Sequence, residues 1–221
     1  MRSLPLPLAL TARLTPVVVL ACAGWAMSSD PAAPAAADRP PSQRTPAGSA
    51  SAPSSTAVSK SYEAAPAPCS SVPVATVKSL VPGAKTAGKE IPSTDTSLRR
   101  TCSWNALQGY DYRWLDVSFE ITGSDDAAKK EYQQRVAEKS GGGEVPGVGD
   151  AGYSVVNLTT ESKQETREGV VLVRASNALV VVTYNGSDFE SKKAPSTDEI
   201  NKGAIKAAKS AVAALGSGTS G

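Results

Sequence analysis

The chain contains no histidine, few aromatic residues and almost no net charge, and each of these absences excludes a class of function. Without histidine there can be no Ser-His-Asp or Cys-His catalytic system and no histidine-ligated metal site. Lys and Arg number 23 against 21 Asp and Glu, which gives a formal net charge of +2. So small an excess offers no basic surface to neutralise phosphates, and we expect no nucleic-acid partner.

Aromatic residues make up only 5% of the 221 residues, whereas proline occurs 16 times and glycine 18 times. This composition is thin for a chain that is globular throughout, so part of it is expected to lie outside any packed core. The length suits one domain with additional segments.

Residues 1–21 have the features of a secretory signal peptide. Arg2 and Arg13 supply positive charge, and an uncharged run of about 14 residues follows them. A membrane-spanning helix needs about 20 apolar residues, so we expect no permanent transmembrane anchor here.

The tetrapeptide Val19-Leu20-Ala21-Cys22 resembles the bacterial lipobox, in which the cysteine is acylated and becomes the first mature residue. It predicts a lipoprotein held by lipid (palmitate or a similar acyl group) at Cys22, on the extracytoplasmic face of the cell membrane. Two or three acyl chains would anchor the protein stably. The alternative is cleavage near Ala26, which would yield a free secreted protein.

Residues 22–68 are predicted to form a disordered tether. Between residues 28 and 68, 31 of 41 residues are Ala, Pro, Ser or Thr. A segment with so few large apolar residues cannot bury enough surface to offset the entropy of ordering it. We expect it to hold a folded domain away from the membrane.

The pattern changes at residue 69, and residues 69–216 predict one α+β domain, with a disordered tail at 217–221. Alternating apolar and polar residues indicate strands, clearest at residues 112–122, and helical spacing with capping residues indicates helices. Neighbouring strands favour a largely antiparallel sheet, an α/β sandwich of about five strands and three helices in the order α-β-β-α-β-β-β-α. The expected helices are 72–81, 124–139 and 196–215, and the expected strands are 101–107, 112–122, 153–158, 169–175 and 178–184.

Two cysteines remain in this domain, Cys69 and Cys102. An even pair in an exported protein most simply forms a disulfide, and we predict one here. Trp104, two residues beyond Cys102, is expected to pack against it in the core.

Several motifs follow one another in a fixed order: Cys22, the Ser/Pro/Ala tether, Cys69-Ser-Ser-Val-Pro-Val, Leu80-Val81-Pro82-Gly83, Cys102-Ser103-Trp104, Val145-Pro146-Gly147-Val148-Gly149-Asp150-Ala151-Gly152, and a hairpin around Asn177. In this order they resemble a family of actinobacterial envelope lipoproteins whose domain has no known function. The resemblance covers residues 69–216. It implies an exported, lipid-anchored, disulfide-bridged α/β sandwich similar to the PsbP-type fold, and it supplies no catalytic residues.

Two motifs raise the possibility of chemistry. Residues 147–152 spell G-x-G-x-x-G, but they follow a helix and lead into a strand, the reverse of a dinucleotide site, so we interpret them as a turn. Asp116 and Glu120 share the polar face of one strand, which keeps an envelope hydrolase that uses carboxylates as an alternative. Four strand positions separate them by about 13 Å, which is long for a glycosidase pair.

Trp114 has the parity of the polar positions in its strand, so it should point away from the core. We predict a recognition surface formed by Trp114, Tyr110 and Tyr112, with Arg99 and Arg100 near them.

The leading hypothesis is a non-catalytic accessory domain that binds an unknown envelope protein or small ligand. No catalytic, cofactor-binding or metal-binding residue is predicted.

Overall fold

The computed structural model of the protein describes residues 60–217. The predicted signal peptide, Cys22, most of the predicted tether and residues 218–221 of the predicted tail lie outside the described residues.

The domain is built on one seven-stranded sheet in the order β1-β2-β3-β7-β6-β5-β4, in which all neighbouring strands are antiparallel. Three helices pack on this sheet, so the predicted α+β class and antiparallel sheet are confirmed. The strands are β1 (Lys89–Ile91), β2 (Arg99–Gln108), β3 (Asp111–Ile121), β4 (Gly143–Glu144), β5 (Ala151–Glu161), β6 (Gln164–Ala175) and β7 (Ala178–Asp188), and the helices are α1 (Val74–Leu80), α2 (Asp125–Ala137) and α3 (Thr197–Ser217).

The expected number of strands was too low by two. The missed strands, β1 and β4, are three and two residues long and form the two edges of the sheet. So short a segment shows no alternation of apolar and polar residues, and only pairing with a longer strand makes it visible.

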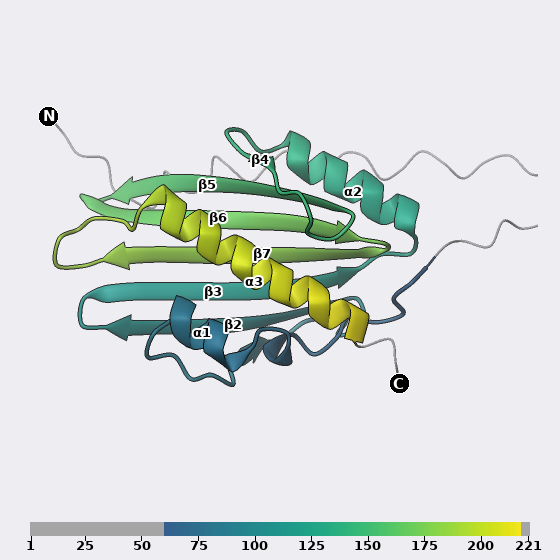
Figure 1. Cartoon of the computed structure of the whole chain (residues 1–221), viewed down its shortest axis with the longest axis horizontal. Coiled ribbons are helices and arrows are strands. Elements are labelled where there is room, and N and C mark those ends of the chain that lie inside the picture. Colours follow the sequence, from purple (N-terminus) through teal and green to yellow (C-terminus); the bar gives the residue numbers. More distant parts are fainter. Residues whose placement is uncertain (1–59, 218–221) are drawn as a thin grey trace, which may run out of the picture. The chain divides into compact units, whose positions relative to one another are not determined.

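The alternation in β3 separates the two faces of the sheet. Leu115, Val117 and Phe119 are fully buried on the face that α3 crosses, which we call the front face (Figure 1). The residues between them point to the opposite side, which we call the back face. The sheet therefore has its main core on one side only.

Helix α3 lies close to the front face because small residues meet there. A Cβ added at Gly169 of β6 would lie 2.9 Å from Ile200 Cγ2, so only glycine admits the helix at this distance. Ser196 caps the start of α3, because the Glu199 amide donates to Ser196 Oγ at 3.1 Å. The fully buried apolar side chains of α3 are Ile200, Ala204, Ala207, Ala208, Ala211 and Leu215.

Helix α2 belongs to the back face, where it contacts β6 and β7. Ser124 caps it, accepting from the Ala127 amide at 3.0 Å. Of the residues that face the sheet, Ala128 is fully buried, whereas Tyr132 and Val136 are half-buried. Within residues 60–217, α2 is the one helix on this face, and a single short helix covers only part of a sheet of this width.

The predicted disulfide between Cys69 and Cys102 is confirmed, with the Cα atoms 5.1 Å apart. Trp104 is buried beside it, and its Nε1 donates to the Thr86 carbonyl at 3.1 Å. Gly88, with φ of +66°, lies over both, since an added Cβ would come within 2.7 Å of Cys102 Sγ and of the indole. The bridge joins the start of the domain to β2.

Residues 60–68, which the sequence assigned to the tether, pack on the domain. Ala65 is buried, and its amide donates to the Ser97 carbonyl at 2.7 Å. The Asn177 side chain, fully buried at the β6–β7 turn, accepts from the amides of Ser61 and Tyr62 at 2.9 and 2.8 Å. It also donates to the carbonyls of Tyr62 and Thr122 at 2.8 and 3.1 Å. The packed domain thus starts before Cys69, because this amide holds the incoming chain.

We expect Asn177→Ala to lower the free energy of unfolding by about 2–3 kcal/mol, because it removes four hydrogen bonds at a buried site. Asn157→Ala is the matched control. That residue is exposed on β5 and should change stability by less than about 0.5 kcal/mol. Urea unfolding followed by tryptophan fluorescence measures both, and equal stabilities for the two variants would contradict the role given to Asn177.

Candidate functional site

Aromatic side chains lie at the end of the sheet away from α2, and two of them, Tyr112 and Trp114, belong to the back face. Tyr110 and Phe189 are 58% and 46% exposed, and Tyr112 and Trp114 are half-buried. We call these four residues the aromatic surface. The β2–β3 hairpin and the end of β7 bring them together, because the Phe189 amide donates to the Tyr110 carbonyl at 2.9 Å. The prediction that Trp114 points away from the core is confirmed.

The indole of Trp114 is fixed in orientation by two contacts. Its ring meets that of Tyr112 edge to face, with centroids 6.4 Å apart and planes at 85°. Its Nε1 donates to Asp116 Oδ1 at 2.7 Å. Tyr112 is in turn 6.0 Å from Phe189, ring centre to ring centre. With its only polar atom satisfied, this half-buried indole can be contacted by a ligand through its ring atoms alone.

The environment of Tyr112 disfavours its ionised form. Burial raises the pKa of the Tyr112 phenol above its ordinary value, and the nearby carboxylate of Asp116 raises it further. The phenol therefore stays a neutral hydrogen-bond donor and acceptor across the physiological range.

Five residues lie directly opposite one another across five strands, with Trp114 among them. We call this row the polar rung: Asn105 of β2, Trp114 of β3, Asn185 of β7, Glu168 of β6 and Asn157 of β5.

Apart from Trp114, the side chains of the polar rung have no hydrogen bond or ion pair within residues 60–217. Asn105 and Asn157 are exposed, and Asn185 and Glu168 are half-buried. Because they lie on a flat sheet face, their amide and carboxylate groups are open to a ligand. Sequence reasoning missed this row, since alternation within each strand marks polar positions but does not give the register between strands.

Arg99 and Arg100 do not join the aromatic surface as predicted. The register places Arg99 opposite Glu120, with Arg99 Nε and a Glu120 carboxylate oxygen 3.7 Å apart, toward the other end of the sheet. Arg100 points to the front face, where it makes a two-pronged contact with Glu90 at 2.6 and 2.9 Å. The antiparallel hairpin separates residues 99 and 100 from Trp114 by most of the length of β2.

The back face has a shallow depression of about 400 Å³ between Asp116 and Arg99. Its remaining lining residues are Ile91, Pro92, Ser93, Thr94 and Thr101. It adjoins the aromatic surface through Asp116, the residue that holds the Trp114 indole.

The two carboxylates considered for hydrolysis are both engaged. Asp116 accepts from Trp114, and Glu120 is held by Arg135 at 2.5 Å and by Arg99. Carboxylates that serve as hydrogen-bond acceptors and ion-pair partners are anchored, and nothing in this arrangement converges on a substrate.

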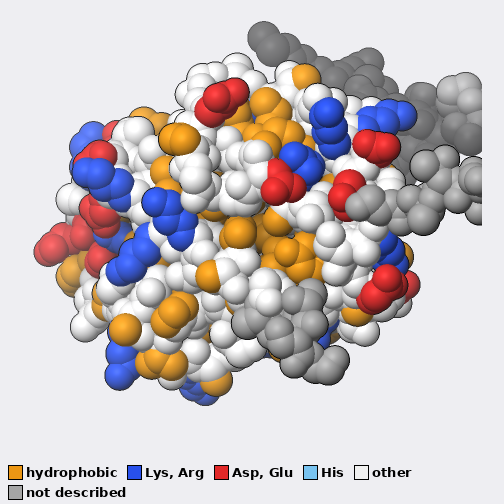
Figure 2. Space-filling view, turned by 45° about the vertical axis from the view of Figure 1, so that its right-hand side comes forward, with side chains coloured by type: hydrophobic (Ala, Val, Ile, Leu, Met, Phe, Trp, Pro, Cys, Tyr) orange, Lys and Arg blue, Asp and Glu red, His pale blue; other side chains and the backbone are white. Residues whose placement is uncertain are grey.

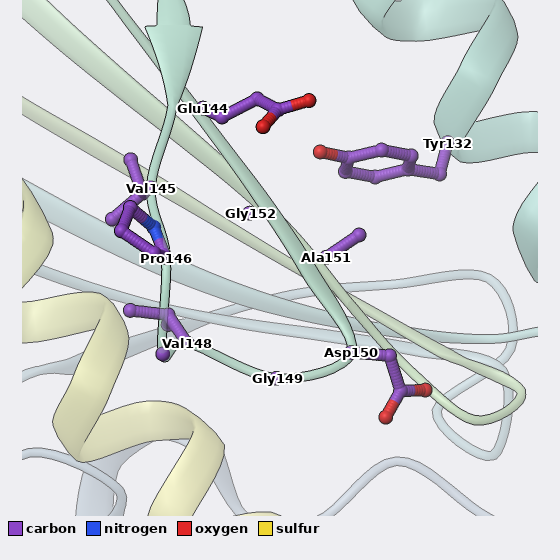
Figure 3. Close-up of a pocket in the computed structure, with 10 residues that line it drawn as sticks. Tyr132, Glu144, Val145, Pro146, Val148, Gly149, Asp150, Ala151 and Gly152 are labelled. Atoms are coloured by element: carbon purple, nitrogen blue, oxygen red, sulfur yellow. The ribbon is translucent and has the colours of Figure 1, made fainter.

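The glycine-rich segment forms the connection from β4 to β5, as the turn interpretation predicted. Gly147 and Gly149 have positive φ, and Val148 is buried. The segment encloses a small pocket of about 260 Å³, into which Tyr132 and Glu144 point from opposite sides (Figure 3). Burial and the carboxylate of Glu144 raise the pKa of Tyr132. Asp150 instead binds Arg174 at 2.9 Å, so the loop is tied to β6.

Basic and acidic side chains are intermingled on the side of the molecule seen in Figure 2, with apolar side chains among them. Within residues 60–217, no three cysteine or acidic side chains are placed to hold a metal ion. In the same residues, no helix has the length and apolar character needed to cross a membrane.

The variant Asp116→Asn should lower the pKa of Tyr112 only part of the way to its ordinary value. It removes the negative charge that opposes phenol ionisation, whereas burial remains. Titration of ring-labelled tyrosine by NMR measures this, with Tyr112→Phe assigning the resonance. Glu144→Gln is the control, because it should lower the pKa of Tyr132 and leave the pKa of Tyr112 unchanged. If the pKa of Tyr112 is the same in Asp116→Asn as in the wild type, the proposed effect of the Asp116 charge on Tyr112 is contradicted.

Comparison with known proteins gives only distant likenesses. No protein-family model matches the chain, and no curated protein matches it. A solved structure from Bacteroides thetaiotaomicron is similar at 10% identity and a TM-score of 0.32, over 50% of this chain and 50% of that one, so this chain spans about half its length. The extracellular domain of PknH from Mycobacterium tuberculosis is similar at 14% identity and a TM-score of 0.31, over 59% of this chain and 84% of that domain. Neither likeness is close enough to bear on function.

Proposed function

We propose that the protein is an exported lipoprotein of the cell envelope, and that its domain is a non-catalytic binding module whose ligand lies on the aromatic surface. The observation that carries the binding role is the fixed, half-buried indole of Trp114 on an open sheet face. Exposed aromatic groups of this kind are typical of recognition surfaces.

The disulfide supports export, because such bonds persist in oxidising compartments outside the cytoplasm. The signal peptide and lipobox of the sequence point to the same location and add the anchor at Cys22. The hydrolase alternative gains no support, since Asp116 and Glu120 are both held by other side chains.

The direction in which the chain enters the domain fits a tethered binding module. Residues 61 and 62 are held at Asn177, next to the end of β3 at Ile121. Tyr112 lies nine strand positions away along β3, which is about 30 Å. The point where the described chain enters the domain is therefore distant from the aromatic surface.

The anchor is tested by Cys22→Ala in the full chain. We expect the wild-type protein to partition with membranes and into the detergent phase, and the variant to become soluble, because the acylated residue is lost. Cell fractionation with Triton X-114 measures this. A variant that remains as firmly membrane-bound as the wild type would contradict the lipobox.

The binding surface is tested by photo-crosslinking in the cells that export the protein. A benzoyl-phenylalanine in place of Leu107, which is 57% exposed and directly opposite Tyr112, should form adducts that Trp114→Ala abolishes. The same group in place of Lys209, exposed on α3, is the control and should give no adduct that depends on Trp114. Absence of adducts at Leu107, or adducts that persist in Trp114→Ala, would contradict the proposed surface.

A further inference from the structure

The polar rung offers hydrogen bonds and the aromatic surface offers ring contacts, and both suit one class of ligand. We infer that this ligand is a neutral polysaccharide segment laid across the strands. This inference rests on the proposed function, because it names the class of ligand for that same surface. It follows from what the side chains offer, what they lack, and how far they extend.

The indole of Trp114 offers a flat apolar surface of fixed orientation. Its N–H is used by Asp116, so a ligand meets only the ring surface and not its donor. An aromatic ring surface attracts weakly polarised C–H groups, such as those on one side of a pyranose ring. Tyr112, set at 85° to the indole, adds a wall and a neutral hydroxyl group.

On both sides of Trp114 the rung offers amides that have no other partner in residues 60–217. Asn105 and Asn185 are directly opposite Trp114 on the two neighbouring strands. Each side-chain amide carries both donors and an acceptor, as hydroxyl groups require. Glu168 beyond Asn185 adds an acceptor. A ligand with apolar C–H faces and many hydroxyl groups satisfies both features together.

The charges favour a neutral ligand over an anionic one. The central acidic groups are Glu168 on the rung and Asp116 on the next row, and neither has an ion pair within the described residues. By register, two of the cations on this face are Lys89, on the edge strand β1, and Arg99, which is paired with Glu120. A phosphate or uronate on the rung would therefore lie against carboxylates.

The rung is longer than a single sugar. Five strands are separated by four spacings of about 4.8 Å, so the row extends over about 19 Å. Helix α2 covers neither end of this row, because Asn105 and Asn157 at its two ends are exposed. An extended chain can therefore run across the sheet and continue past it.

Affinity electrophoresis of the full-length mature protein provides the test. Native gels would contain dextran, a soluble β-glucan, a galactomannan, or the neutral polysaccharide fraction from the envelope of the cells that export the protein. A gel with hyaluronate serves as the anionic arm. We expect retardation in at least one neutral gel and none with hyaluronate.

Variants separate binding by the rung from non-specific retardation. Trp114→Ala should weaken the apparent affinity by about tenfold or more, the usual loss for an aromatic contact at a binding site. Asn185→Ala should weaken it less, and Trp114→Phe should retain part of it. Gln133→Ala, an exposed amide on α2, is the matched control and should bind as the wild type does.

Three results would overturn the inference: no retardation in any neutral gel, retardation unchanged by Trp114→Ala, or equal retardation with hyaluronate. Its failure differs from failure of the proposed function. If adducts at Leu107 depend on Trp114 but consist of protein, the binding surface stands and the polysaccharide ligand is wrong. If no such adducts form, the surface itself is wrong.

Discussion

The close contact between α3 and the front face of the sheet is the constraint on which the rest of the structure depends. Glycine at position 169 lets the helix approach so closely that an added Cβ on the strand would lie 2.9 Å from Ile200 Cγ2 and 3.3 Å from the Ile200 carbonyl oxygen. Helix α1 joins the same side, where the Tyr184 hydroxyl donates to the Leu80 carbonyl at 2.7 Å. The disulfide and Trp104 are also there. The larger apolar cluster of the strands therefore lies on this face. The opposite face has fewer buried apolar residues, among them Leu172 and Leu179, and within residues 60–217 it has one helix, α2.

This asymmetry explains how a polar and aromatic face can remain open without destabilising the domain. A half-buried indole would be costly if its N–H had no partner, and Asp116 supplies one at 2.7 Å. Thr101 and Ser118 are hydrogen-bonded to each other at 2.9 Å in the same way. On the back face, Trp114, Thr101 and Ser118 thus have hydrogen-bond partners, whereas the buried Ser103 hydroxyl and the amides of the polar rung have none in the described part of the chain. Groups that the fold does not need are the ones available for binding.

The sequence was sufficient for what depends on local pattern. Alternation in β3 gave the strand and its buried face, and the pair Cys69 and Cys102 gave the disulfide. The sequence was insufficient for features that depend on the register between strands or on contacts between distant parts of the chain. The expected position of Arg99 and Arg100 beside Trp114 failed because a hairpin runs nearby residues in opposite directions. Asn177 was correctly placed in a turn, but its amide bonds to residues 61 and 62, more than a hundred positions away, leave no signal in the chain.

The domain is neutral overall, but the charges on its back face are unevenly distributed. Residues 69–216 contain 18 basic and 18 acidic side chains, so no long-range field draws a partner in. Locally the balance is uneven: Arg135 and Arg174 lie toward α2 with Glu120 and Asp150, whereas Asp116 and Glu168 lie toward the aromatic surface without ion pairs in residues 60–217. An anionic group on that surface would lie against these two carboxylates. With no long-range field to attract it, a partner is selected there by ring contact and hydrogen bonding.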